Sequence, residues 1–137
     1  LTIDDAGNNN EIFEISVDGN GGADDSGKDL AWDNEIVVAN NQGDTIYADG
    51  GTDVLVGGQG TDTFDLSNVL DDSTIYIKNF ESNDNMILKA GSSTASNTNT
   101  SDGVISVSLN NGAEGYYIYT DAEDEQLVLN NLTLAGV

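Results

Sequence analysis

Residues 39–65 read ANNQGDTIY, ADGGTDVLV and GGQGTDTFD when the sequence is written in lines of nine. The sixth place of each line holds an aspartate, and these residues are Asp44, Asp53 and Asp62. The eighth place holds a large apolar residue, and these are Ile46, Leu55 and Phe64. A fixed period of this kind indicates a repetitive fold in which each unit stacks on its neighbours.

The glycines of these lines predict tight turns. The third line, residues 57–65, carries the whole pattern G-G-x-G-x-D-x-U-x, where U is large and apolar. Glycine allows positive φ and lets carbonyl oxygens approach a cation that a Cβ would obstruct. The first line is less regular, with Asn41 and Gln42 before Gly43, but asparagine also tolerates left-handed backbone. The x-U-x strand sends its apolar residue inward, so the three U residues predict the interior.

These motifs resemble the RTX, or hemolysin-type, calcium-binding repeats of bacterial proteins exported by type I secretion. In that family each nonapeptide is a turn plus a short strand, and two nonapeptides make one coil of a β-roll. The resemblance therefore implies an all-β fold: a short right-handed parallel β-roll, with a strand-rich N-terminal cap and antiparallel β-strands C-terminal to the roll. Turn-forming aspartates in a metal-free stack of hairpins are the alternative reading of the same residues.

Turns eighteen residues apart lie on the same side of such a roll, so we expect Asp44 and Asp62 to share a calcium ion. The resemblance implies further ligands around the turns, namely Asn40, Gln42, Gly57, Gln59, Gly51 and Gly60. Asp53 needs a partner one coil away, and its candidates are Asn34 or Glu35 before it and Asp71 after it. Because Ser73 occupies the apolar place that follows Asp71, we expect the repeat to end at residue 65.

The composition points the same way. The chain of 137 residues carries 25 acidic residues, three lysines and no arginine, a formal net charge of −22. Such a chain repels nucleic acid and anionic membrane surfaces. Carboxylates and backbone carbonyls are the ligands that hard divalent cations prefer, and the alternative explanation of the charge is an acidic surface that keeps the protein soluble.

Cysteine and histidine are both absent. Disulfides, thiolate catalysis, histidine-activated nucleophiles and ordinary zinc sites are therefore excluded, and we expect no enzyme. Catalysis by paired carboxylates is the remaining alternative, but the acidic residues are too numerous to single out a pair. No apolar run approaches the roughly 18 residues of a membrane span, so we expect no membrane insertion. We also expect a monomer.

We expect residues 1–137 to form a single domain, with cap strands in 1–38, calcium-binding repeats in 39–65 and a C-terminal β cap with a secretion signal in 66–137. An insertion at 18–33 is a candidate for an ion of its own, and its Trp32 for a lid on the roll. The segment 75–88 resembles the one that commonly follows RTX repeats, except that Asn79 stands where an aspartate is usual.

The sequence thus predicts a calcium-binding module that folds on extracellular calcium and supports type I secretion as the C-terminal part of a larger secreted protein or adhesin. Its expected partners are Ca²⁺ and the type I secretion machinery, and its expected location is outside the cell or on a bacterial surface. The alternative is a calcium-dependent carbohydrate-binding or adhesion module, because Tyr116, Tyr117 and Tyr119 could present a glycan-stacking face. Partly buried strand tyrosines are the plainer explanation of those three residues.

Overall fold

The computed structural model describes residues 2–4, 13–16, 34–39, 43–48, 50–96, 103–109 and 114–135. The strands within these ranges are β1 (Thr2–Asp4), β2 (Phe13–Ser16), β3 (Glu35–Val38), β4 (Thr45–Tyr47), β5 (Thr52–Val56), β6 (Thr63–Leu66), β7 (Thr74–Lys78), β8 (Asn85–Leu88), β9 (Ser93–Ser96), β10 (Val104–Leu109), β11 (Glu114–Tyr119) and β12 (Leu132–Leu134). A 3₁₀ turn η2 (Ala122–Asp124) leads into the short helix α1 (Glu125–Leu129). None of the helices among these residues is long and apolar enough to cross a membrane.

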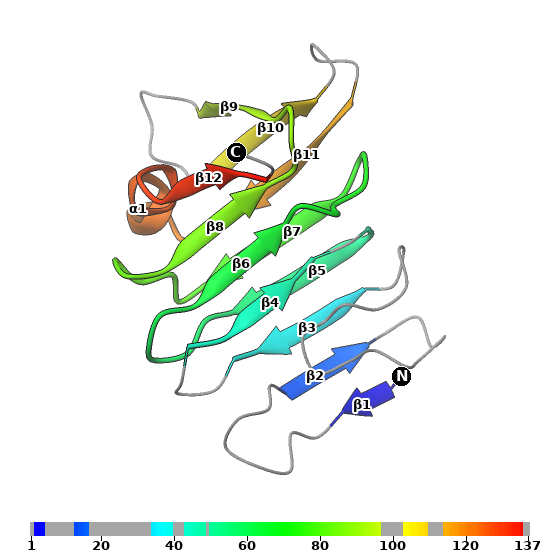
Figure 1. Ribbon diagram of the computed structural model, residues 1–137. Coiled ribbons are helices and arrows are strands. Elements are labelled where there is room, and N and C mark those ends of the chain that lie inside the picture. Colours follow the sequence, from blue (N-terminus) through cyan, green and yellow to red (C-terminus); the bar gives the residue numbers. More distant parts are fainter. Residues whose placement is uncertain are drawn as a thin grey trace.

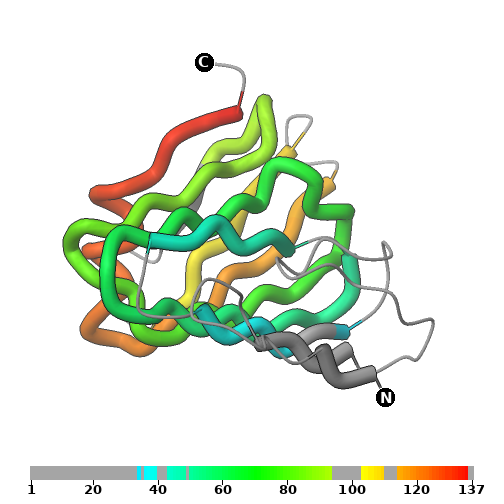
Figure 2. Tube along the Cα trace, turned by 60° about the horizontal axis from the view of Figure 1, so that its bottom comes forward, coloured from blue at the N-terminus to red at the C-terminus, as the bar shows by residue number. Residues whose placement is uncertain are grey.

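The strands form two sheets that face each other across a common core (Figures 1 and 2). The larger sheet has the order β1-β2-β3-β5-β7-β11-β10-β9, and the smaller has the order β12-β8-β6-β4. Along the repeat the chain alternates between the sheets, so β3, β5 and β7 pair in parallel on one side and β4, β6 and β8 on the other. This alternation is a parallel β-roll, which confirms the predicted fold class.

The core of the roll is built by the predicted apolar column. Ile46, Leu55 and Phe64 are all fully buried, at 0% exposure. Ile46 and Phe64 are direct partners in the smaller sheet, and Leu55 lies in the larger sheet between its partners Val37 and Ile77. The next coil adds Met86 beside Phe64 in the same register. Apolar residues thus stack row upon row between the sheets.

The roll continues past residue 65, where the repeat was expected to end. Partners in the smaller sheet are 18 residues apart from Thr45 to Thr63 and 22 apart from Thr63 to Asn85. The larger sheet shows the same lengthening, because Asp53 pairs with Ile75, 22 residues later. The four added residues lie in the turn between β6 and β7, since both longer intervals include that turn. The apolar column therefore resumes at Ile77, the partner of Leu55, and Ser73 belongs to the enlarged turn.

The C-terminal region combines both kinds of pairing. β9, β10 and β11 pair with one another antiparallel, as expected, while β11 joins β7 in parallel. The segment η2–α1 then carries the chain to the smaller sheet, where β12 pairs in parallel with β8 (Figure 1). Val128 of α1 is buried in the common core. The apolar C-terminal sequence is therefore a strand that extends the smaller sheet.

Candidate calcium site

One edge of the smaller sheet carries a column of aspartates. Thr45, Thr63 and Asn85 are partners in consecutive strands, and the residues immediately before them are Asp44, Asp62 and Asp84. The backbone confirms this register, because the amide N of Thr63 donates to the carbonyl O of Asp44 at 2.7 Å. The amide N of Asn85 donates to the carbonyl O of Asp62 at 2.9 Å in the same way.

The Asp62 carboxylate links two stacked turns. Its Oδ1 accepts a hydrogen bond from the amide N of Asp44 at 3.0 Å, and its Oδ2 accepts one from the amide N of Gly58 at 2.8 Å. The side chain is fully buried, at 0% exposure. Burying a carboxylate is costly unless it is paired and hydrogen-bonded. Each carboxylate oxygen has lone pairs beyond the one used here, so both can also accept a cation.

Asp84 repeats this arrangement one coil further. Its Oδ1 accepts from the amide N of Asp62 at 2.9 Å, its Oδ2 accepts from the amide N of Glu81 at 2.7 Å, and its exposure is also 0%. Burial raises the pKa of Asp84; the two N–H donors oppose that rise, and the nearby charges of Asp62 and Glu81 reinforce it. The column thus concentrates buried negative charge on one edge of the roll.

Glycines allow the turns of this edge to stack closely. A Cβ on Gly43 would lie 2.6 Å from the carbonyl O of Thr61, and one on Gly57 would lie 2.8 Å from the carbonyl O of Asn79. The Gly57 position would also bring a Cβ within 3.3 Å of Asp62 Oδ2. Real Cβ atoms essentially never lie within 3.0 Å of such atoms. The turns therefore stack too closely for a Cβ at Gly43 or Gly57.

The two steps of the column differ in what fills the space between the turns. In the step from Asp62 to Asp84, Asn79 Nδ2 donates to the carbonyl O of Gly57 at 2.7 Å. Asn83 Nδ2 donates to the carbonyl O of Gly60 and to Thr61 Oγ1, both at 3.2 Å. Two amide groups thus bind the turn oxygens that a cation would otherwise contact. We call Asn79 and Asn83 the amide clamp.

The opposite edge, in the larger sheet, is less uniform. Asp53 is fully buried on β5, and its partner on β7 is Ile75. Asn34, one coil before, accepts a hydrogen bond on Oδ1 from the amide N of Thr52 at 2.7 Å. Asp71, the other expected partner, instead accepts on Oδ1 from the amide N of Gly115 at 2.6 Å. The structure thus brings Asn34 beside Asp53 and takes Asp71 away, because the enlarged turn shifts Asp71 out of the column.

The remaining expected ligands lie in the turns. Gln59 is exposed in the turn 57–62, and Gly60 has a positive φ of 95° there. Gly51 also has a positive φ, 88°, and its carbonyl O accepts from the amide N of Thr74 at 2.9 Å. Asn40 and Gln42 lie outside the described residues, as does the insertion 18–33 with Trp32. Among the described residues no three acidic side chains converge as a metal cluster, so an ion here would depend on turn carbonyls as well.

The donor set of the step from Asp44 to Asp62 fits calcium. Ca²⁺ takes six to eight oxygen ligands from carboxylates and carbonyls at flexible geometry. The step offers the buried carboxylate of Asp62, the half-buried Asp44 and closely stacked glycine turns, and turn carbonyls would supply the remaining ligands. No described lysine neutralises the column, because Lys78 Nζ binds Asp121 Oδ1 at 2.8 Å and Lys89 Nζ donates to the carbonyl O of Val69 at 3.0 Å.

Sequence reasoning passed over two features of this edge. No ion was expected at Asp84 because Asn79 stands where an aspartate is usual, and the place of Asp84 in the column, 22 residues after Asp62, was not recognised. The amide clamp was seen only as a departure at Asn79 from a usual aspartate. The signal that could have found Asp84 is Met86, a large apolar residue that follows Asp84 by two residues as Phe64 follows Asp62.

Comparison with known proteins agrees with this geometry. Residues 31–64 match a family model described as the RTX calcium-binding nonapeptide repeat (4 copies). The match begins eight residues before residue 39, and it includes β3, which pairs in parallel with β5. No curated protein and no solved structure matches the chain. Residues 31–64 are therefore a run of RTX calcium-binding nonapeptide repeats, a structural module that binds Ca²⁺.

Proposed function

We propose that this chain is a calcium-triggered folding module in which Asp44 and Asp62 hold an ion between two stacked turns. The observation that carries the proposal is the position of the Asp62 carboxylate, which is fully buried between the turns and accepts the amide N of Asp44. As the family resemblance implies, turn carbonyls around Gly57 and Gln59 and those of Asn40 and Gln42 complete the proposed shell. When bound, the ion supplies two positive charges and oxygen coordination that tie the turns together.

Calcium and folding are coupled through the charge of the edge. Without metal, the carboxylates of Asp62 and Asp84 are buried side by side in one column, and their mutual repulsion opposes the compact state. The roll is narrow and contributes one large apolar residue per nonapeptide to its core, which offsets little of the chain entropy. Binding free energy for the ion then appears as folding free energy.

Asp53 is proposed as a ligand of a second ion on the opposite edge, with Asn34 as its neighbour and Gly51 as the turn glycine. Asn34 and Asp53 both lie within the residues that match the family model. Ile75 stands where the next coil would need another aspartate, so the second site ends with this step.

This coupling supports a role in export. RTX repeats are typical of secreted proteins. A chain that stays unfolded at low cytosolic calcium remains competent for type I secretion, and it folds when it meets calcium outside the cell or at the cell surface. Extracellular calcium modules have dissociation constants of about 10⁻⁴ to 10⁻³ M, which separates the two compartments. On this proposal the chain is the C-terminal part of a larger secreted protein, and it has no catalytic role.

The test is circular dichroism of the purified chain in chelator and in calcium. We expect a largely disordered spectrum in chelator and a strand-rich one at millimolar calcium, with no such change at equal magnesium because Mg²⁺ demands stricter octahedral geometry. Identical spectra in chelator and calcium would refute the coupling.

A further inference from the structure

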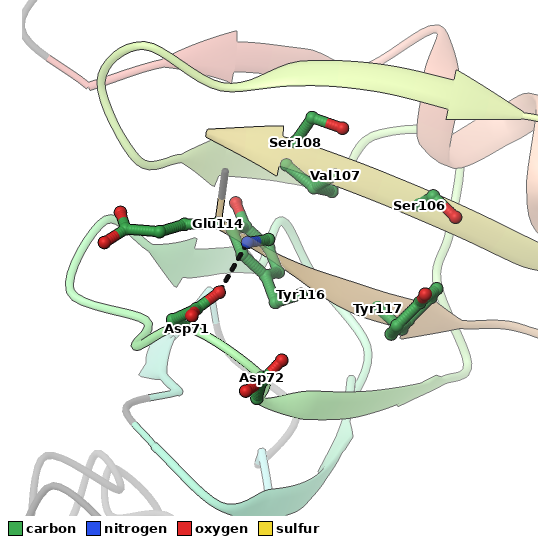
Figure 3. Close-up of a pocket in the computed structure, with 9 residues that line it drawn as sticks. Asp71, Asp72, Ser106, Val107, Ser108, Glu114, Tyr116 and Tyr117 are labelled. Atoms are coloured by element: carbon green, nitrogen blue, oxygen red, sulfur yellow. Dashed lines mark hydrogen bonds between the residues drawn. The ribbon is translucent and has the colours of Figure 1, made fainter. Parts of the chain in front are cut away.

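The enlarged turn between β6 and β7 builds a second feature, at the end of the roll away from the family match. A pocket of about 470 Å³ opens between this turn and the outer face of β10 and β11 (Figure 3). Its polar lining comes from three carboxylates, those of Asp71, Asp72 and Glu114, and from the hydroxyls of Ser106, Ser108 and Tyr117. Its volume lies within the usual range for small-molecule sites.

The acidic wall of the pocket is fixed by the backbone. Asp71 Oδ1 accepts from the amide N of Gly115 at 2.6 Å, and the amide N of Asp72 donates to the carbonyl O of Gly115 at 2.7 Å. Asp72 has a left-handed φ of +64°, which aspartate tolerates better than most residues. Gly115 itself must be glycine, since a Cβ there would lie 2.5 Å from the carbonyl O of Val107.

An aromatic face adjoins this wall. Tyr117 is 49% exposed and lines the pocket, whereas its neighbour Tyr116 is buried in the core. From Tyr117 the rings continue along the sheet, with Tyr119 at a centroid distance of 6.4 Å and Tyr76 stacked on Tyr119 at 5.1 Å. Exposed tyrosine offers a flat apolar surface together with a polar hydroxyl. The pocket thus combines hydrogen-bonding groups with an accessible ring.

These groups select among ligand classes. No basic side chain lines the pocket, so an anionic ligand meets only repulsion. No three acidic groups among the described residues converge as a metal site. The apolar lining residues Val107 and Tyr116 are buried, so a purely apolar ligand finds little surface. An ammonium ligand also suits the carboxylates, and the hydroxyls can accept from its N–H groups, so spermidine is tested as the representative of this competing class.

We propose that this pocket binds an uncharged saccharide, with one sugar ring packed on Tyr117 and its hydroxyls bound by Asp71, Asp72 and the serines of β10. Sugar hydroxyls both donate and accept, which matches carboxylates and protein hydroxyls together. A pyranose ring also presents a face of C–H groups that packs on an aromatic ring. The enlarged turn, which interrupts the nonapeptide spacing, thereby acquires a function of its own. The pocket uses none of the residues proposed to bind calcium, apart from Asp71, whose calcium role the geometry does not support.

The test measures binding of neutral hexasaccharides of glucose, mannose and galactose by calorimetry and by saturation-transfer NMR, with the chain in about 5 mM calcium. We expect saturable binding of at least one of them that persists at about 0.3 M NaCl, because no ion pair contributes. Tyr117→Ala and Asp72→Asn are each expected to weaken it about tenfold or more.

Two matched variants serve as controls. Tyr47→Ala removes a tyrosine from β4 in the other sheet, and Glu123→Gln removes an exposed carboxylate from η2, so neither should change saccharide binding. Circular dichroism of all four variants separates a lost site from a lost fold. The proposal is overturned if no hexasaccharide binds, if Tyr117→Ala binds as well as the unmodified chain, or if spermidine binds instead and is released by salt.

Discussion

Asp62 and Asp44 are joined across stacked turns, with Asp62 Oδ1 accepting the amide N of Asp44 at 3.0 Å, although the two residues are 18 positions apart. The same carboxylate holds the amide N of Gly58 in its own turn, and its side chain is fully buried. One side chain therefore ties the two turns that are proposed to clasp an ion. Any change at this edge is expected to alter folding and calcium binding together.

The close stacking of turns makes Gly57 sensitive to substitution. Gly57→Ala places a Cβ 2.8 Å from the carbonyl O of Asn79, which is backbone and cannot easily move. We expect a loss of about 1–3 kcal/mol in the free energy of unfolding, the usual cost of overpacking. Urea unfolding in calcium measures it.

Gly91→Ala is the control for this effect. Gly91 also lies in a turn and has a φ of +83°, but a Cβ there meets nothing within 4 Å. Its substitution therefore reports only the cost of a side chain at positive φ, about 1–2 kcal/mol, whereas Gly57 has no positive φ and its substitution reports the clash. A Gly57→Ala variant that is no less stable than the unmodified chain would show that the turns are not stacked as described.

Because the amide clamp joins the turns of Asp62 and Asp84, we expect these two turns to stack without metal. Asn79→Asp replaces the donor Nδ2 by a carboxylate oxygen, which faces the carbonyl O of Gly57 in place of a hydrogen bond. We expect the free energy of unfolding in chelator to fall by about 1–3 kcal/mol, the cost of unpairing a polar group. Aspartate tolerates the left-handed φ of 58° at this position, so the backbone should not contribute.

Calcium should recover part of this loss, because the new carboxylate is an additional ligand for a cation between the turns. Asn68→Asp, at an exposed position in the enlarged turn, adds the same charge without touching the clamp. Chemical denaturation of both variants with and without calcium distinguishes them. Equal behaviour of Asn79→Asp and Asn68→Asp in chelator would mean that the clamp contributes no stability.

Phe64 is expected to be the most sensitive residue of the apolar column. It is fully buried, and its ring centroid lies 5.4 Å from that of Phe80. Phe64→Ala should cost about 3–5 kcal/mol through lost burial and the cavity that remains. In thermal melts followed by circular dichroism, this variant should require higher calcium to fold.

Tyr76→Ala is the comparison for the column, because Tyr76 is 38% exposed on the outer face of β7. It should change stability by less than about 1 kcal/mol, as surface substitutions usually do. If Phe64→Ala and Tyr76→Ala have the same melting temperature, the assignment of Phe64 to the core is contradicted.

The strict period of nine explains how much the sequence could predict. Asp44 and Asp62 repeat at twice that period, so their place on one edge follows from the geometry of a two-sheet roll. Ile46, Leu55 and Phe64 repeat with them, and their burial is confirmed.

The period fails where four residues are added between β6 and β7. Counting in nines hides this addition, because Asp71 still falls in the aspartate column, and the strand pairing of Ile75 with Asp53 reveals it. The amide clamp was hidden for a different reason: Asn79 and Asn83 act through hydrogen bonds to turn carbonyls one coil away, which no local pattern encodes. The pocket beside Gly115 likewise joins segments 44 residues apart.

The most direct measurement is calcium titration by calorimetry of the unmodified chain, Asp62→Asn and Glu123→Gln. Glu123 is an exposed residue of η2, so Glu123→Gln removes one negative charge far from the stacked turns. The account predicts that the unmodified chain and Glu123→Gln bind calcium with the same affinity and release the same heat of folding. Asp62→Asn should bind calcium about tenfold or more weakly and should lose the heat of folding. Undiminished calcium affinity and folding heat in Asp62→Asn would contradict the account.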